Sequence, residues 1–347
     1  MARVTLKTIA EAVGVSRTTV SNAFSRPDQL APELRQRILD VAEELGYSGP
    51  DPAARTLRRG RSGVVGVLLT EELSYAFTDP YAVAFLRGLA EIAEISSTSL
   101  LLMAWPDHDS AEAAVREAIV DGFIAFCLDK DHPALEALRQ RRLPYVIAGE
   151  PYLDGVPFVG VDDRAAAHTV ASYLLRLGHR RLGVLHPGPA GIDLADAGSF
   201  GAVAARLAGF RDAVEEAGLS WDDVAVQHAI HSREGGRAGA ARLLDLHPRP
   251  TAIIATTDLI ALGALAAVHD RGLTVPDNVS VTGFDDIPAA GEAGLTTIRQ
   301  PKSEKGRTVG RLLLDDGLDD APGGGARRIL MAYELITRSS TSLPPEF

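Results

Sequence analysis

Polar side chains recur along the stretch RTTVSNAFS at residues 17–25, and their types suit hydrogen bonds to nucleic acid. If the stretch is a helix that turns by about 100° per residue, one outward arc of about 140° carries Arg17, Thr18, Ser21, Asn22 and Ser25. Arginine can pair with the guanine edge in the major groove and asparagine with the adenine edge, while serine and threonine hydroxyls suit phosphates. The pattern predicts a DNA-contacting helix; a helical hairpin with a solvated polar face is the alternative.

Two short helices must position this arc. Apolar residues at i, i+3, i+4 and i+7 predict the first helix: Leu6, Ile9, Ala10 and Val13. Thr5 stands where a capping hydroxyl accepts a free backbone N–H, and Gly14 ends the helix as a left-handed C-cap. Ser16 caps a second helix from Arg17 to about Phe24, whose inner side carries Thr19, Val20, Ala23 and Phe24. Two helices joined by a short turn that contains glycine are typical of the helix-turn-helix motif.

A third helix is predicted from Pro32, a residue favoured at the first helical position, to Leu45. The segments VTLKTIAEAVGVS, RTTVSNAF, the ELGY end of the third helix and AARTLRRG resemble the lactose-repressor (LacI/GalR) family. The resemblance extends through the whole chain. It implies DNA contacts by the following residues: Thr5, Leu6, Ser16, Arg17, Thr18, Thr19, Ser21, Asn22, Ser25, Ala54 and Leu57.

Residues 50–62 are predicted to form a hinge helix and linker after a DNA-binding headpiece at 1–49. Pro50 and Pro52 stop the third helix, and Pro52 can start a short helix that is marginal in water by itself. The resemblance implies that this helix pairs with that of a dimer mate on DNA, where Leu57 wedges into the minor groove beside the small Ala54. On the free protein we expect a flexible tether.

Charge is divided unevenly along the 347 residues. The formal net charge is −11, but residues 1–62 carry 10 Lys and Arg against 7 Asp and Glu, and the remainder has a net charge of −14. A mildly basic head on an acidic body directs DNA to one end.

The chain has neither an apolar run long enough for a membrane span nor a signal-peptide core, so we expect a cytoplasmic protein without membrane contact. The one cysteine, Cys127, is predicted to be a buried strand residue in the apolar run FIAFCL.

Apolar strands alternate with amphipathic helices from Val64 onward. Strands are predicted at 64–69, 98–105, 122–128 and 144–149, and again at 181–186, 223–228, 251–257 and 279–285. Helices are predicted near 81–95, 110–120, 133–141, 201–217, 233–246 and 258–270. Two such series predict two lobes, each with a doubly wound parallel sheet. This arrangement resembles the type I periplasmic-binding-protein fold that the same family uses for its effectors.

The chain is predicted to cross between the lobes. Within an effector-binding and dimerisation domain at 63–347, the first lobe takes about 63–162 and 302–324, and the second about 163–301 and 325–342. A helix at 303–316 rejoins the first lobe, the turn APGGG follows, and 326–338 returns as a strand to the second lobe. The predicted fold class is an all-α helix-turn-helix headpiece plus an α/β two-lobed domain.

The candidate effector site lies between the lobes, because ligands of doubly wound sheets bind outside the carboxyl ends of the strands. The resemblance implies that these residues line it: Tyr81, Arg206, Thr257, Phe284 and Asp285. Trp105 is a further candidate wall, because it stands at the carboxyl end of a predicted strand. Thr257 replaces an asparagine, and Gly149 an aspartate, that many sugar-binding members carry. From the residues alone, Arg206 could be a surface cation and Asp285 could cap a turn, while Asp258 is predicted to be a helix N-cap.

Motifs of catalysis are missing from the sequence. It contains no G-x-S-x-G elbow, P-loop or G-x-G-x-x-G, so we expect no catalytic residues and no cofactor. His228 and His231 have no third ligand in view, so no metal site is expected.

We predict a ligand-responsive, dimeric repressor whose partners are a palindromic operator in double-stranded DNA, a small-molecule effector such as a sugar, and a second copy of the chain. The alternatives are a solute-binding protein of transport, an enzyme on the same scaffold, and a catabolite-type regulator that needs a co-repressor.

Overall fold

In the computed structural model the chain consists of two compact units, Met1–Ser62 and Gly63–Phe347. The structure describes residues 4–47, 49, 60–69, 72–104, 108–187, 201–314 and 327–346. The predictions for the hinge helix with Ala54 and Leu57, for Trp105 and for the glycine turn at 321–325 lie outside the described residues.

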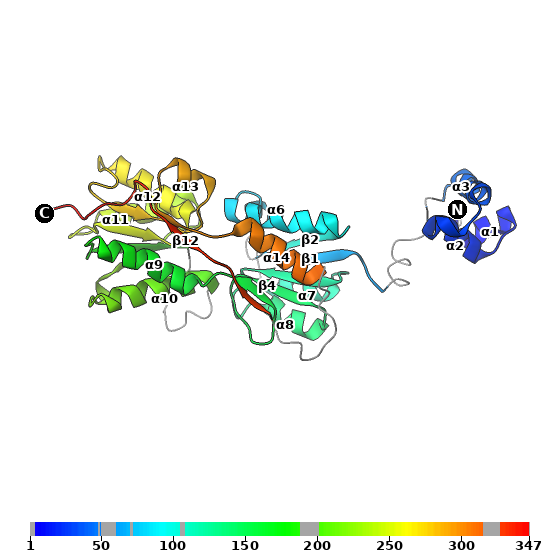
Figure 1. Cartoon of the computed structure of the whole chain (residues 1–347), viewed down its shortest axis with the longest axis horizontal. Helices are drawn as coiled ribbons and strands as arrows, with labels where there is room; N and C mark the ends of the chain where they lie inside the picture. Colours follow the sequence, from blue (N-terminus) through cyan, green and yellow to red (C-terminus); the bar gives the residue numbers. More distant parts are fainter. Residues whose placement is uncertain are drawn as a thin grey trace. The chain divides into compact units, whose positions relative to one another are not determined.

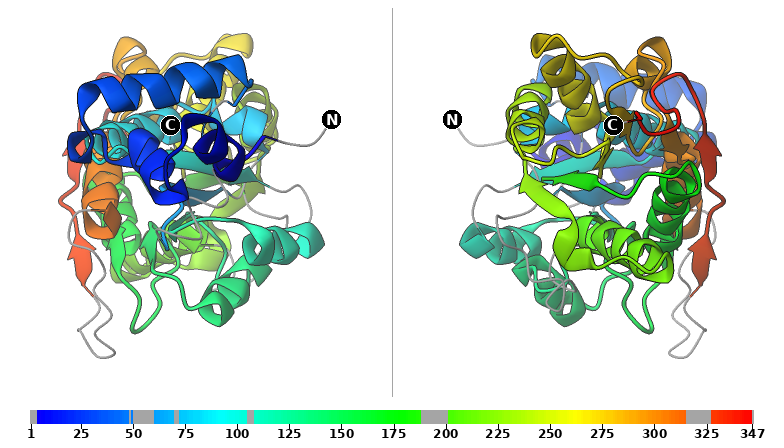
Figure 2. Two further views of the ribbon diagram at one scale, coloured as in Figure 1. Left: turned by 90° about the vertical axis from the view of Figure 1, so that its right-hand side faces the viewer. Right: turned by 90° about the vertical axis from the view of Figure 1, so that its left-hand side faces the viewer.

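The headpiece unit is a bundle of short helices: α1 (Leu6–Val13), α2 (Arg17–Ser25) and α3 (Pro32–Glu44), with a 3₁₀ turn at Pro27–Gln29. Thr5 caps α1 by accepting a hydrogen bond from the backbone N–H of Thr8 at 3.4 Å, and Gly14 ends it at φ 78°. Ser16 caps α2 by accepting from the N–H of Thr19 at 3.0 Å. The helices lie against one another (Figure 2, left). They enclose a small core of Ile9, Ala10, Val13, Val20, Ala23, Ile38 and Ala42. The predicted helices and caps are confirmed.

The first lobe is built on a six-stranded parallel sheet in the order β11-β5-β4-β3-β1-β2. The strands are β1 (Val64–Leu69), β2 (Ser99–Ala104), β3 (Gly122–Phe126), β4 (Tyr145–Ala148), β5 (Phe158–Gly160) and β11 (Arg328–Leu330). One face, with Val65 and Val67, packs against α6 (Pro80–Ile95) and α14 (Lys302–Leu314). The other face, with Leu68 and Phe123, packs against α7 (His108–Glu117) and α8 (Pro133–Arg141), as Figure 1 shows. The short helix α5 (Leu73–Ala76) follows β1.

The second lobe repeats this three-layer plan around a four-stranded parallel sheet in the order β7-β6-β8-β9. Its strands are β6 (Leu182–His186), β7 (Ala225–His228), β8 (Ala252–Ala255) and β9 (Ser280–Thr282). Helices α9 (Asp163–Arg176) and α10 (Gly201–Glu216) cover one face, and α11 (Arg233–Leu244) and α12 (Asp258–Asp270) cover the other (Figure 2, right). The antiparallel pair β10 (Thr297–Arg299) and β12 (Glu334–Ile336) completes the lobe with α13 (Pro288–Glu292) and a 3₁₀ turn at Trp221–Asp223.

Glycines bring α6 and α14 into close contact beside the first sheet. A Cβ built on Gly88 would lie 1.9 Å from the carbonyl oxygen of Ser303, and one on Gly306 would lie 2.1 Å from that of Phe85. No side chain fits at either position, so the two helix backbones touch. The first turns of both helices are thereby held side by side, and these turns carry Tyr81 and Lys305.

The predicted fold class is confirmed, two local predictions need correction, and some elements were not predicted. The stretch 326–338 is not one strand of the second lobe: β11 pairs with β5 in the first sheet, the chain crosses at 331–333, and β12 pairs with β10. Cys127 follows β3 rather than lying in it, with φ 52° and partial exposure. Strand β5 and helix α9 were not predicted, because a three-residue strand is too short to show a pattern and α9 carries apolar residues on much of its surface.

Candidate DNA interface and interlobe site

Helix α2 turns only part of its predicted DNA-contacting arc toward solvent. Arg17 and Thr18 are exposed, whereas Asn22 and Ser25 are half-buried. Ser21 is 8% exposed, so the prediction that it faces outward is wrong. Periodicity gives the direction of a side chain around the helix and not how deeply the rest of the headpiece covers it. The carbonyl oxygen of Ser21 accepts a hydrogen bond from Ser25 Oγ at 2.8 Å.

Other predicted DNA contacts also shape the headpiece. The hydroxyl oxygens of Ser16 and Thr19 lie 2.8 Å apart at the exposed start of α2. Leu6 is half-buried against the headpiece core, and Thr5 is exposed. Four of these side chains therefore stand at the starts of α1 and α2, where backbone N–H groups and the helix dipole suit a phosphate.

Two arginines that the sequence analysis did not assign hold α1 and α2 in place. Arg37 on α3 donates to the carbonyl oxygen of Val13 at 2.7 Å, and Arg35 donates to that of Ala23 at 3.3 Å. Both carbonyls lie near the ends of their helices, where a cation complements the helix dipole. A basic residue on an otherwise polar helix face gives no sign of this role in the sequence.

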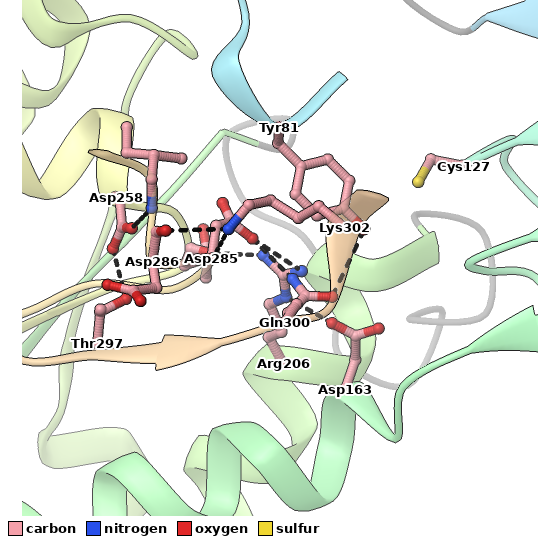
Figure 3. Close-up of polar contacts among 12 residues, drawn as sticks. Tyr81, Cys127, Asp163, Arg206, Asp258, Asp285, Asp286, Thr297, Gln300 and Lys302 are labelled. Atoms are coloured by element: carbon pink, nitrogen blue, oxygen red, sulfur yellow. Dashed lines mark hydrogen bonds and ion pairs between the residues drawn. The ribbon is translucent and has the colours of Figure 1, made fainter. Parts of the chain in front are cut away.

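Arg206 is the centre of the polar cluster between the lobes (Figure 3). It comes from α10, is 6% exposed, and is therefore not a surface cation. Its Nε donates to Asp163 Oδ1 at 2.7 Å and its NH1 donates to the carbonyl oxygen of Thr256 at 2.6 Å. Its NH2 lies 3.7 Å from Asp285 Oδ1, and its guanidinium lies 3.7 Å from the centroid of the Phe284 ring.

Asp285 is held in an uncommon backbone conformation at the end of the segment after β9. Its φ is 117°, in the region that favours glycine, and it is 6% exposed. Its carboxylate accepts from Gln300 Nε2 at 2.7 Å, and its carbonyl oxygen accepts from Lys302 Nζ. Burial raises the pKa of Asp285 to about 8, although Arg206 favours the ionised form. A residue held this way against its backbone preference is typical of a ligand site.

Tyr81 extends the cluster into the first lobe. Its ring stacks on Phe126 with centroids 6.0 Å apart. Its hydroxyl accepts from Lys305 Nζ at 2.6 Å and donates to Gln300 Oε1 at 3.5 Å. Gln300 lies in the crossing segment between β10 and α14. The residues that this chain of contacts joins are called the interlobe cluster: Tyr81, Asp163, Arg206, Asp285, Gln300 and Lys305.

Asp258 is not the N-cap of α12, which corrects the prediction for it. Thr257 occupies the cap position and makes no capping bond through its side chain. Asp258 is fully buried, and its carboxylate accepts from the backbone N–H of Ile287 at 2.8 Å and from the Thr297 hydroxyl at 2.5 Å. It therefore ties α12 to the turn that carries Asp285. Burial raises the pKa of Asp258 to about 7.

The lobes also touch beside the cluster. Tyr75 on α5 places its hydroxyl 2.9 Å from Nδ1 of His231, in the segment after β7. The His228 ring lies beside that of His186, with centroids 6.1 Å apart. Among the described residues, no group of three or more His, Cys, Asp or Glu is placed to hold a metal ion.

Residues 5–49 match the family described as bacterial regulatory proteins, lacI family, and residues 171–341 match a periplasmic binding protein-like domain. An HTH-type transcriptional regulator of Mycolicibacterium smegmatis is 41% identical over 99% of this chain and 97% of its own length. The chain belongs to the lacI family.

Solved structures of lacI-family regulators and related proteins share the fold. A transcriptional regulator CelR–cellobiose complex is 28% identical with a TM-score of 0.70, and covers 97% of this chain and all of its own. A LacI-family regulator of Corynebacterium glutamicum is 32% identical with a TM-score of 0.68, and covers 99% of this chain. This lacI-family protein is thus a DNA-binding transcriptional regulator of the helix-turn-helix class. No helix in the described ranges is both long and apolar enough to span a bilayer.

The structure brings together four residues predicted for the effector site of this lacI-family protein: Tyr81, Arg206, Phe284 and Asp285. Thr257 is 6% exposed nearby, and its hydroxyl has no hydrogen-bond partner among the described residues. The sequence analysis missed Asp163, Gln300, Lys302 and Lys305. The signal for Lys305 was available: it lies four and seven positions before Val309 and Leu312, on the apolar stripe of α14, where a lysine is out of place.

Proposed function

We propose that this regulator is a dimeric repressor whose affinity for a palindromic operator is switched by a small hydroxylated molecule bound between the lobes. A sugar or sugar derivative is the favoured class, because the similar regulator CelR forms a complex with cellobiose. The operator and the regulator meet in the cytoplasm. The interlobe residues serve binding and not catalysis, because nothing in their arrangement pairs a nucleophile with a base.

The observation that carries this proposal is the continuous line of polar contacts from one lobe to the other. Tyr81 in the first lobe contacts Gln300 on a crossing segment, and Gln300 donates to Asp285 in the second lobe. These groups lie outside the carboxyl ends of the two sheets, where doubly wound folds bind ligands. Hydroxyl groups of a ligand can both donate and accept, so they can replace the contacts between Tyr81, Gln300 and Asp285.

Switching requires that the ligand prefer one arrangement of the lobes. A ligand that bonds to Asp285 and Tyr81 at once favours the arrangement in which the lobes are close. The contact between Tyr75 and His231 belongs to the same arrangement. In a dimer, a change in lobe arrangement alters the spacing of the two headpieces and therefore their fit to the half-sites of the operator.

The test is a gel shift with full-length protein on a palindromic fragment from its own upstream region, with and without a panel of sugars that includes cellobiose. We expect one compound to change the operator affinity of the wild type. Asp285→Ala is expected to keep operator binding and lose the response. Asp212→Ala is the matched control, because Asp212 is a partly exposed carboxylate on α10 that pairs with Arg164.

The proposal fails if Asp285→Ala and the wild type respond to the same compound with the same midpoint. Sedimentation of the DNA complex tests the dimer separately: one chain per palindrome contradicts it. A protein that binds the fragment only with a second macromolecule present supports the co-repressor alternative instead.

A further inference from the structure

Lys305 is a fully buried cation on the apolar side of α14. Its side chain is 1% exposed, and Val309 and Leu312 on the same stripe belong to the core between α14 and the first sheet. Lysine is almost never buried to this extent unless it is paired with an opposite charge. Lys305 is therefore expected to have an anionic partner.

The only hydrogen bond that the Lys305 ammonium makes to the described residues is to Tyr81 Oη, at 2.6 Å. None of their carboxylate oxygens lies within ion-pair distance, 4.0 Å, of Nζ. The ammonium has three N–H donors, so two remain for another acceptor. Nζ also lies 5.4 Å from the centroid of the Tyr81 ring, a cation–π contact with a neutral group that supplies no N–H acceptor in place of an anion.

Two described titratable groups that interact with Lys305, Tyr81 and Cys127, supply no negative charge. Burial raises the pKa of the Tyr81 hydroxyl well above its usual range, and it raises the pKa of the Cys127 thiol to about 12. Both groups are neutral at physiological pH. An ammonium buried without an anion among the described residues is strongly destabilising, because its lost hydration is not replaced.

The other buried cation of the interlobe cluster is differently placed. Arg206 forms a hydrogen-bonded ion pair with Asp163 at 2.7 Å, so its charge is met within the protein. Lys305 stands at the opposite end of the same line of contacts, beside Tyr81 and Gln300. Within the part of the chain that the structure describes, the Arg206 end of the cluster has its charge paired, and the Lys305 end has a cation without a carboxylate in ion-pair contact.

We propose that Lys305 and Tyr81 form a subsite for an anionic group of the effector, either a phosphate monoester or a carboxylate. This rests on the proposed function for the location of the effector. The oxygens of the anion accept the two remaining N–H bonds of Lys305, and charge-assisted bonds of this kind are short and strong. Asp163 does not oppose the anion because Arg206 holds it, and Asp285 opposes it little because its raised pKa keeps it largely protonated at neutral pH.

The experiment measures ligand binding by the full-length protein without DNA. The probes are inorganic phosphate, glucose 6-phosphate and glucuronate, each compared with glucose and with chloride at equal ionic strength, by thermal shift and calorimetry. We expect at least one anionic probe to raise the melting temperature of the wild type more than glucose does. Phosphate and glucose 6-phosphate report a phosphate site, and glucuronate reports a carboxylate site.

Variants at Lys305 separate this subsite from general charge attraction. Lys305→Met is expected to weaken binding of the preferred anion by about tenfold or more, and Lys305→Arg to retain part of it. Lys305→Met is also expected to fold, because an apolar side chain replaces an unpaired buried charge. Arg307→Met is the control on the same helix, since Arg307 pairs with Glu91 and Glu304 near the surface.

Two results overturn the proposal. In one, no anionic probe stabilises the wild type more than glucose does. In the other, Lys305→Met and the wild type bind the preferred anion equally. Either result leaves the proposed function standing if a neutral compound still changes operator affinity, so the two failures can be told apart.

Discussion

The headpiece and the interlobe cluster use polar side chains in opposite ways. In the headpiece, Arg17 and Thr18 are exposed and are open to a partner that comes from solution. In the interlobe cluster, Arg206 and Asp285 are buried and bond to other parts of the protein. The exposed arrangement suits a rigid partner, such as a DNA duplex, that these side chains contact at its surface. The second suits a small ligand that enters by exchanging contacts already made within the protein.

The contrast between exposed and buried charge recurs on a single pair of helices. Between α9 and α10, Arg206 meets Asp163 in the interior, and Arg164 meets Asp212 near the surface, both at short distances. The side chains of the first pair are 7% and 4% exposed, and those of the second are 59% and 27% exposed. The two arginine–aspartate ion pairs should therefore contribute very different amounts to the free energy of unfolding.

Arg206→Ala tests that difference and has the largest expected effect. It leaves Asp163 buried without its cation, which should cost about 3–5 kcal/mol of the free energy of unfolding. Arg164→Ala removes only a solvated pair and should cost at most about 1 kcal/mol. Urea unfolding followed by circular dichroism measures both. Equal losses in the two variants would mean that burial does not set the energy of these pairs.

Arg17→Ala tests the exposed side of the comparison. We expect it to lower the affinity for the specific operator by about 1–3 kcal/mol and to relax one base preference, with little change in folding. A gel shift on the operator and on a scrambled duplex measures both parts. If affinity for the scrambled duplex falls by the same factor, Arg17 contacts phosphate and does not read a base.

The same contrast explains what the sequence could predict. Helix α2, its N-cap Ser16 and the C-cap of α1 at Gly14 follow from local patterns, because these residues act within a few positions of one another. The residues of the interlobe cluster come from four helices and the segments between them, and no local pattern joins Asp163 to Arg206 or Gln300 to Asp285. The family resemblance supplied Arg206 and Asp285, but not the partners that this chain gives them. Ser21 was misplaced because periodicity gives a direction around the helix and not the height of the neighbouring side chains.

Asp285→Asn tests the electrostatic state of the buried site through pH. The pKa of Asp285 is raised by burial to about 8, so the folded protein binds this proton more tightly than the unfolded chain does. Stability from this group is therefore present at low pH and is lost as the pH rises toward about 8, by no more than about 1.4 kcal/mol per pH unit. Asparagine cannot ionise, so the variant should lose less stability between about pH 6 and about pH 8. Parallel urea midpoints for variant and wild type across that range would contradict the assignment.

Ser16→Ala has the smallest expected effect. Together with Ser16→Asp, it tests whether Ser16 only caps α2 or also contacts DNA. The loss of the α2 cap should cost about 1 kcal/mol, which corresponds to about fivefold faster hydrogen exchange in residues 17–25 of the full chain.

Ser25→Ala is the control at the other end of α2, because its hydroxyl bonds back to the Ser21 carbonyl, a contact that adds little to helix stability. Ser16→Asp restores a cap but places a negative charge where a phosphate would bind. If Ser16→Asp exchanges like the wild type yet loses operator affinity, Ser16 both holds the helix and contacts DNA; if it keeps that affinity, its role is confined to the fold.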